Sequence, residues 1–301
     1  MRVLVTGATG LIGTELVALL SSKNIDVHYL ALHSGEIRNQ QGISGFLWDP
    51  RRGVIDENCL MGVDAIIHLA GAPIAKRWTS SYKQEIIESR TMSAHLLYKV
   101  LKSNPHQVKN FISASAIGIY PDSLSEAYTE DNKTVDDSFL GNVVVKWESS
   151  VNKFSQIGIN VCKIRTGLVL SKKGGVLQEL LKPIKMGIGS AYGNGKQWQS
   201  WIHVDDLTNM YYEALNQQWK GIYNGTAPNP VTNTTLTKKI AQKLNKPFFM
   251  PEVPKIILKW MLGEMHTLLF TSQKVLPQNA LQQNFIFQYP EIDGALNDLL
   301  Q

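Results

Sequence analysis

Three glycines near the start of the chain have the spacing of a phosphate-binding turn. Gly7, Gly10 and Gly13 follow an apolar run at residues 1–6 and precede a helical pattern at residues 15–20, which predicts strand, turn and helix. Glycine permits the tight turn, lets backbone N–H groups approach a pyrophosphate, and allows the helix to pack closely on the strand. The positive end of the helix would then face the phosphates. We expect a dinucleotide site here; an ordinary structural turn is the alternative.

The end of the second predicted strand, residues 26–32, is where such a fold contacts the adenosine ribose. NAD-selective sites usually carry a carboxylate there, whereas this chain has Ala31, Leu32 and His33, with Arg38 slightly beyond. The missing carboxylate removes the main repulsion against a 2′-phosphate, which favours NADP over NAD without excluding NAD. His33 or Arg38 would supply the positive contact, unless both simply belong to a surface loop.

A third candidate stretch is the apolar run at residues 63–72, which ends in small residues around Ala70 and Gly71. The run predicts a buried parallel strand. Small residues at its carboxyl end would let a flat cofactor lie against the backbone. His68 invites a catalytic interpretation, but a lone histidine in an apolar strand is more often a hydrogen-bonded core residue.

The elements that must position these residues alternate between strand and helix patterns. Further strands are predicted at residues 46–48, 108–115 and 160–170, and this alternation predicts an α/β fold with a Rossmann-like, doubly wound parallel sheet. We expect an NAD(P)-binding domain over residues 1–170, to which later segments return. A smaller substrate-side α/β region would occupy residues 171–301.

Composition and charge restrict the partners. The chain has 301 residues, 44% of them hydrophobic, and a net charge of +5, which fits an ordinary globular protein. Its basic residues are not clustered with aromatic ones, so we expect no nucleic-acid partner. No uncharged apolar run approaches the ~20 residues of a membrane helix. Cys59 and Cys162 lie far apart and predict neither a zinc site nor a disulfide framework, which favours the reducing cytoplasm. The run at residues 203–207 is interpreted as a helix start capped by Asp205 or Asp206, not as a metal site.

Several short motifs occur in an order that is similar to one protein family. The turn at residues 6–13 resembles the cofactor loop of the extended short-chain dehydrogenase/reductase superfamily. The remaining motifs resemble, essentially end to end, the subgroup called the epimerase family, or atypical short-chain reductases of the 39U type. These motifs are His68–Ala72, Lys76–Thr79, Lys83–Arg90, Ser113–Ala116, Lys146–Glu148, Trp198–Asp206, Asn224–Pro230 and Ser272–Pro277.

The resemblance implies a set of cofactor contacts. Members of the subgroup that resemble this chain bind NADP, although relatives have Ser-Arg where this chain has Ala31-Leu32. Together with the two loop residues inferred above, the expected cofactor-binding residues are Gly7, Thr9, Gly10, Leu11, Ile12, Gly13, His33, Arg38, Leu69, Ala70, Gly71, Glu85, Arg90, Ser113, Arg165 and Val169.

The resemblance also implies catalytic groups. Typical superfamily members use a hydroxyl at the end of the fifth strand, a tyrosine as proton donor, and a lysine one helical turn later that lowers the tyrosine pKa. Ser115 is the natural hydroxyl. The pattern Tyr98-x-x-x-Lys102 lies in the preceding helix, and no tyrosine stands where the pair should fall. We therefore assign Lys146 as a ribose or phosphate contact and Tyr120 as a displaced acid. A solvated lysine and a tyrosine packed at a turn are the alternatives.

Two functions follow from these residues. The first is an NAD(P)-dependent oxidoreductase or epimerase that acts on a small carbonyl, alcohol or sugar-like substrate, in which the nicotinamide does the redox chemistry. The second is a catalytically inactive dinucleotide-binding sensor, for which the missing tyrosine is the main argument. We expect a small-molecule substrate as the main partner, allow for a homodimer, and expect neither a membrane nor a bound metal.

Overall fold

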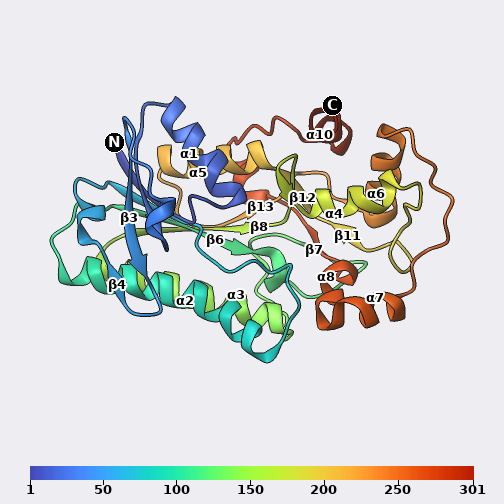
Figure 1. Ribbon diagram of the computed structural model, residues 1–301, viewed down its shortest axis with the longest axis horizontal. Helices are drawn as coiled ribbons and strands as arrows, with labels where there is room; N and C mark the ends of the chain where they lie inside the picture. The colour runs from blue at the N-terminus through green and yellow to red at the C-terminus, as the bar shows by residue number, and fades with distance from the viewer.

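The computed structural model describes residues 1–301 and is built around one sheet of eight strands (Figure 1). The strand order is β13-β8-β6-β5-β1-β2-β3-β4, and neighbours are parallel except for β3 and β4. The expected α/β fold with a Rossmann-like sheet is confirmed. The strands are β1 (Arg2–Thr6), β2 (Asp26–Ala31), β3 (Ile43–Asp49), β4 (Val54–Ile55), β5 (Ala65–His68), β6 (Asn110–Ala116), β8 (Asn160–Thr166) and β13 (Gly221–Gly225).

The chain winds outward in both directions from the centre of this sheet. It runs from β1 through β2 to β3 on one side and from β5 through β6 and β8 to β13 on the other. Ligands of open α/β sheets bind at the carboxyl ends of the strands where the winding reverses. The fold therefore places the switch point between β1 and β5, next to the glycine turn.

Helices cover both faces of the sheet. Helix α1 (Leu11–Ser22) packs against α5 (Val204–Asn216) on one face, and α2 (Ser80–Ser103) packs against α3 (Phe139–Asn152) on the other, as Figure 1 shows above and below the sheet. The strands between them are almost fully buried and form one large apolar core. Because both faces are covered, β1 and β5 are apolar apart from Arg2, Thr6 and His68 at their ends.

A smaller region follows β8 along the chain. It contains a three-stranded sheet of β10 (Gly174–Gly175), β9 (Leu168–Ser171) and β12 (Trp201–His203), and a second apolar cluster that joins α4 (Val176–Lys185), α6 (Asn233–Lys243) and α10 (Ile292–Leu299). The segment also returns to the large sheet through α5 and β13. A domain boundary near residue 170 stays a prediction.

The remaining elements are short. Strand β7 (Ala127–Tyr128) pairs with β15 (Lys274–Val275), and β11 (Trp198–Gln199) pairs with β14 (Val231–Thr232). Helices α7 (Lys255–Leu262) and α8 (Thr267–Phe270) follow α6 along the chain, and α9 (Gln278–Gln282) packs on β13. No helix is both long enough and apolar enough to cross a membrane.

Some expected boundaries differ for local reasons. The predicted strand at 63–72 stops at His68, because the next two N–H groups, of Leu69 and Ala70, donate to the Thr6 hydroxyl oxygen at 3.1 and 3.0 Å. The predicted strand at 160–170 divides at Gly167, where a Cβ atom would lie 2.2 Å from the Ser200 carbonyl oxygen. The approach of that neighbouring backbone explains the change from β8 to β9.

The expected cap of helix α5 was wrong. His203 is the N-cap, and its Nδ1 accepts a hydrogen bond from the Asp205 backbone N–H at 3.1 Å. The carboxylate of Asp206 instead accepts hydrogen bonds from the backbone N–H groups of Gln288 and Tyr289, at 2.7 and 2.9 Å. Asp206 therefore fixes the segment before α10, a long-range role that residue spacing does not reveal.

Candidate functional site

A cavity of about 620 Å³ lies at the carboxyl ends of β1, β2 and β5, at the switch point of the sheet. Eight of the residues expected to bind a cofactor line it: Gly7, Thr9, Gly10, His33, Leu69, Ala70, Gly71 and Glu85. The volume falls within the range of about 300–1,000 Å³ that is common for ligand pockets. The structure thus brings the glycine turn, the end of the second strand and the small residues after β5 to one place.

The glycine turn is shaped by backbone packing. Gly7 has φ +68°, which favours glycine, and a Cβ atom there would lie 3.0 Å from the Leu69 carbonyl. A Cβ atom on Gly13 would lie 2.1 Å from the Gly7 carbonyl oxygen. These approaches leave room for glycine alone, so the turn is a cradle that a dinucleotide pyrophosphate fits.

Helix α1 begins at this cradle without a cap from its own sequence. Gly10 is the N-cap, no side chain accepts a hydrogen bond there, and the first turn has no acidic residue. The first N–H groups of a helix need an acceptor, and an anion meets that need. Leu11 and Ile12 do not line the cavity with their side chains, so any part they take in binding would come from their backbone N–H groups.

The ribose end of the cavity carries a positive residue that the sequence analysis missed. Arg51 lines the same cavity as His33, and its guanidinium lies 3.4 Å from the Glu85 carboxylate. The expected contact Arg38 does not line it. Its backbone is held by the Tyr29 hydroxyl, which donates to the Arg38 carbonyl oxygen at 3.2 Å and accepts from the Arg38 N–H. Arg51 follows β3, whose carboxyl end lies beside that of β2, and this adjacency was the available signal.

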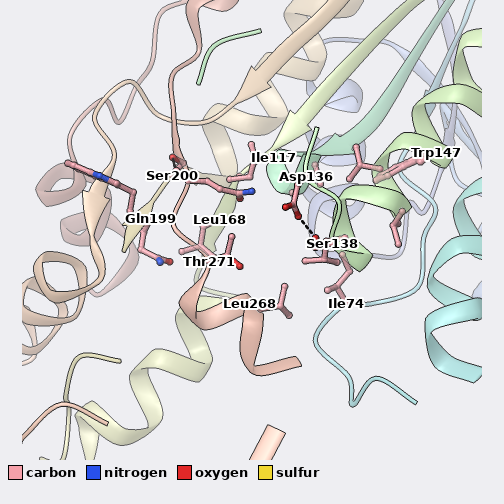
Figure 2. Close-up of a pocket in the computed structure, with 18 of the residues that line it drawn as sticks. Ile74, Ile117, Asp136, Ser138, Trp147, Leu168, Gln199, Ser200, Leu268 and Thr271 are labelled. Carbon is pink, nitrogen blue, oxygen red and sulfur yellow. Dashed lines mark hydrogen bonds between the residues drawn. The ribbon is translucent and has the colours of Figure 1, made fainter. Parts of the chain in front are cut away.

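A second cavity, of about 200 Å³, adjoins the first. Residues 71–73 line the large cavity and Ile74 lines the small one; on α2, Ser89 lines the large cavity and Arg90 the small one. Figure 2 shows the small cavity with Trp147 and Gln199 on opposite sides of the view. Its walls are mainly apolar, and its polar side chains include Asp136, Ser138, Gln199 and Thr271.

The face of α3 that borders the small cavity is apolar. It presents Leu140, Val143, Val144 and Trp147. Lys146 lies on another face, where it lines a separate surface groove between α2 and α3. A tyrosine and a lysine one helical turn apart would have to project from the face that Val143 and Trp147 occupy to reach the small cavity, and that face carries neither residue type.

Ser115 and Tyr120 belong to a buried hydrogen-bond network. The Ser115 hydroxyl donates to the Glu148 carboxylate at 2.7 Å, and the Arg165 guanidinium donates to the same carboxylate at 2.8 and 3.1 Å. The Tyr120 hydroxyl donates to the Asn224 side-chain oxygen at 2.8 Å and accepts from Arg165 at 2.9 Å. Ser115, Tyr120 and Arg165 line neither cavity.

The environment of Tyr120 is not that of a tuned acid. Burial raises the pKa of its hydroxyl, and the charge and hydrogen bond of Arg165 offset this only in part. The catalytic roles of Ser115, Tyr120 and Lys146 stay predictions, and the structure places none of the three side chains at either cavity. The same holds for the cofactor role of Arg165.

The remaining expected contacts lie behind the cavity walls. The Ser113 hydroxyl is fully buried and bonds to His68 Nδ1 at 3.0 Å, while His68 Nε2 bonds to the Ser93 hydroxyl at 2.8 Å. Burial, with the nearby charge of Arg90, lowers the His68 pKa to about 3, so His68 is a neutral core residue. Val169 lies in β9 opposite Ile202 and does not line either cavity.

Fold and site together define a dinucleotide-binding protein of the short-chain dehydrogenase/reductase type. The model of the NAD dependent epimerase/dehydratase family matches residues 3–224, and the chain belongs to this family. A domain of unknown function, DUF1731, matches residues 253–299. An epimerase family protein of Staphylococcus epidermidis is 36% identical over 302 residues, which cover 100% of this chain and 99% of that protein.

Solved structures agree with this assignment. The human epimerase family protein SDR39U1, determined with NADPH, is similar with a TM-score of 0.85 and 29% identity over 99% of both chains. A nucleoside-diphosphate sugar epimerase from Corynebacterium glutamicum has a TM-score of 0.79 and 32% identity; the match covers 100% of this chain and 58% of that one. A UDP-N-acetylglucosamine 4-epimerase from Bacillus cereus, at 17% identity, shares the fold.

Proposed function

We propose that this protein is an NADP(H)-dependent oxidoreductase that acts on a small carbonyl or alcohol substrate. The observation that carries the proposal is that neighbouring residues line the two cavities: Pro73 and Ser89 line the cavity at the switch point, and Ile74 and Arg90 line the small, mainly apolar cavity. In doubly wound sheets the reacting end of a dinucleotide extends from the switch point. A substrate in the small cavity would therefore lie next to it.

In this proposal the large cavity binds the cofactor and the small cavity binds the substrate. Gly7, Gly10 and the backbone at the start of α1 would hold the pyrophosphate, and His33 with Arg51 would face the 2′-phosphate. Bound NADPH supplies hydride transfer, which leaves one proton to be provided to the substrate oxygen. Asp136, Ser138 and Gln199 are polar groups of the small cavity that could orient that oxygen or a water molecule beside it.

The preference for NADP gives a first prediction. Replacing Arg51 with alanine removes the cation that faces the ribose end and leaves the Glu85 carboxylate without its partner at 3.4 Å. We expect the ratio of NADPH to NADH affinity to fall by about tenfold, since a charge-assisted hydrogen bond contributes about 1.5–3 kcal/mol. Titrations followed by nicotinamide fluorescence measure the ratio.

Arg52 provides the matched control for this experiment. It is exposed, pairs with Asp49 and does not line the cavity. Arg52→Ala should leave the NADPH to NADH ratio unchanged. If Arg51→Ala leaves the ratio of NADPH to NADH affinity unchanged, Arg51 does not contribute to the preference for NADP. His33 would then be the remaining candidate for the contact with the 2′-phosphate.

A second candidate function is a catalytically silent sensor of the cofactor. The apolar face of α3, with Val143 and Trp147 at the small cavity, favours it because that face offers no proton donor. The two functions share the cofactor and differ in turnover. A homodimer and a cytoplasmic location, both expected from the sequence, also stay proposals.

The glycine turn allows one experiment to test both functions. Gly10 has φ −80°, so other residues can adopt its backbone, and Gly10→Asp would place a carboxylate against the pyrophosphate. We expect NADPH binding to be lost in Gly10→Asp and to be weakened much less in the neutral Gly10→Asn, which adds the same Cβ atom without the charge. Oxidation of NADPH across a panel of small aldehydes and ketones then separates the functions: turnover supports the enzyme, and tight binding without turnover supports the sensor. If the wild type binds neither NADPH nor NADH, both proposals fail.

A further inference from the structure

Helix α7 exposes most of its apolar residues to solvent. Of its eight residues only Leu258 is buried. Trp260 is 86% exposed and Ile256 is 76% exposed, and Ile257 and Met261 are exposed as well. A short helix gains most of its stability by packing an apolar face against a neighbour, and α7 packs only a minor part of its apolar surface on this chain. The rest is free to bind something else.

The apolar exposure continues onto the chain before α7 and onto the end of α4. Phe249 and Met186, the C-cap of α4, are both exposed. Their segments are joined by the Ser190 hydroxyl, which donates to the Pro251 carbonyl oxygen at 2.6 Å. Figure 1 shows α4, α6 and α7 at one end of the molecule. Exposed apolar side chains gathered in this way mark interaction sites. The α7 surface is defined by Met186, Phe249, Ile256, Ile257, Trp260 and Met261.

The charges around the α7 surface are almost all positive. Residues 243–262 contain one acidic residue, Glu252, against four lysines, and Lys185 adds a fifth cation next to Met186. The four lysines are Lys243, Lys246, Lys255 and Lys259. All five lysines are exposed, and none of them forms an ion pair. This end of the molecule therefore carries positive charge that the chain itself does not neutralise.

The sequence of α7 places lysines directly beside the apolar side chains. Residues four apart lie on the same face of a helix, so Lys255 and Lys259 share one face. Ile256 and Trp260 share the adjoining face, and the buried Leu258 lies opposite them and anchors the helix. An apolar stripe with a tryptophan, bordered by lysines, is typical of a helix that lies in the plane of a membrane surface.

The kind of cation favours a lipid surface over a protein. The positive residues around the α7 surface are all lysines, whereas protein–protein interfaces are enriched in arginine and depleted in lysine. A lysine stem can lie along apolar groups while its ammonium stays in water, which suits the headgroup region of a bilayer. A second copy bound through the same surface would bring two groups of lysines together, and like charges oppose that contact. Anionic lipids attract lysines.

We propose that the α7 surface binds peripherally to a lipid bilayer that contains anionic lipids. Ile256 and Trp260 enter the boundary between headgroups and acyl chains, and the lysines contact the headgroup phosphates. The expectation of no membrane partner rested on the lack of a spanning helix, and a peripheral site needs none. The α7 surface lines neither the large nor the small cavity, so the proposal is independent of the cofactor and of the reaction.

Flotation of the full chain with lipid vesicles tests the proposal. One set of vesicles is phosphatidylcholine alone, and the other contains equal parts of phosphatidylcholine and phosphatidylglycerol. We expect binding to the anionic vesicles that weakens as salt is added. Ile256→Ser/Trp260→Ser should reduce the partition coefficient at least about tenfold, because two large apolar side chains are lost. Lys255→Gln/Lys259→Gln should also reduce it at least about tenfold, since each lysine near an anionic surface contributes about fivefold.

Trp260→Phe separates insertion of α7 from electrostatic attraction alone. Trp260 is the one exposed tryptophan of the seven in the chain, so brominated acyl chains should quench the fluorescence of the bound wild type mainly through this residue. Phenylalanine keeps an apolar ring, and Trp260→Phe should therefore still float with anionic vesicles but lose most of the quenching. Quenching that persists in Trp260→Phe would show that another surface enters the bilayer, which would overturn the assignment to α7.

Matched controls remove the same groups elsewhere. Ile286→Ser removes an isoleucine that is 87% exposed outside the α7 surface, and Lys102→Gln/Lys109→Gln removes two exposed lysines near the end of α2. Both should float as the wild type does. All these variants change exposed side chains, so their unfolding midpoints should match that of the wild type. A loss of flotation in the controls equal to that in the α7 variants would overturn the site.

The wild type alone decides between the possible partners of the α7 surface. No flotation, or equal flotation with neutral and anionic vesicles, would overturn the proposal. A wild-type dimer in sedimentation velocity that becomes a monomer in Ile256→Ser/Trp260→Ser, without flotation of the wild type, would assign the surface to a second copy. Binding of poly-glutamate without flotation would assign it to an acidic protein. Either result would overturn the lipid assignment.

Discussion

Replacing Glu148 with glutamine should destabilise the protein by about 3–5 kcal/mol, the usual effect of removing one partner from a buried ion pair. The Glu148 carboxylate is 9% exposed and lies 2.8 Å from Arg165 and 3.5 Å from Lys163. The carboxylate also accepts a hydrogen bond from the Ser115 hydroxyl. Glutamine keeps the shape but leaves two buried cations without a counter-charge. Chemical denaturation with urea, followed by tryptophan fluorescence, measures the change in unfolding free energy.

The pH dependence of the same variant tests the cause. Burial alone would raise the Glu148 pKa, but the hydrogen bond and charge of Arg165, together with Lys163 and Ser115, lower the pKa below its ordinary value of 4.5. A carboxylate with a depressed folded-state pKa contributes stability that is present above its unfolded pKa and is lost as pH falls through the folded one. The difference between wild type and Glu148→Gln should therefore be full at neutral pH and shrink below about pH 4.5.

Two variants control this prediction. Glu126 is exposed, and only its backbone N–H forms a hydrogen bond, to the Ser123 hydroxyl oxygen, so Glu126→Gln should change stability by less than about 0.5 kcal/mol. Adding Arg165→Met to Glu148→Gln should cost less than the sum of the single changes, because the two side chains interact directly. A loss below about 1 kcal/mol in Glu148→Gln, or strict additivity with Arg165→Met, would mean that the ion pair does little for folding.

The fold was predictable because its signals are local. An apolar run, a glycine turn and an amphipathic helix at the start of the chain indicate one βα unit, and the repeated alternation that follows extends it to a doubly wound sheet. The course of the later segments was less accessible. The Asp206 carboxylate accepts hydrogen bonds from the backbone N–H groups of Gln288 and Tyr289, more than 80 residues away. No residue spacing in the sequence predicts such a contact.

The candidate site also contains residues that the sequence could place and residues that it could not. The expected residues that line the large cavity all belong to the loops after β1, β2 and β5 or to α2, and the loops at a switch point are fixed by topology. The three consecutive residues Lys146, Trp147 and Glu148 show what topology leaves open. They face a surface groove, the small cavity and the buried Arg165, respectively. Side-chain direction on α3 decides their roles, and it depends on packing against distant strands.

The glycine turn gives the prediction with the largest expected effect on binding. A Cβ atom on Gly13 would lie 2.1 Å from the Gly7 carbonyl oxygen and 2.7 Å from the Ala8 Cα atom, both of them backbone. Gly13→Ala must therefore displace the turn, and we expect NADPH affinity to fall by about 100-fold or more, equivalent to about 2.7 kcal/mol. Overpacking should also lower the unfolding free energy by about 1–3 kcal/mol.

A graded series separates displacement of the turn from a general effect of adding a methyl group. A Cβ atom on Gly10 would lie 3.2 Å from the Gly7 carbonyl oxygen, and one on Gly35 would meet nothing within 4 Å. The loss of NADPH affinity should therefore increase from Gly35→Ala, where we expect none, through Gly10→Ala to Gly13→Ala. Because the added atom is the same each time, only its distance from the backbone of the turn differs. Equal affinities across the series would show that the cofactor does not depend on the shape of this turn.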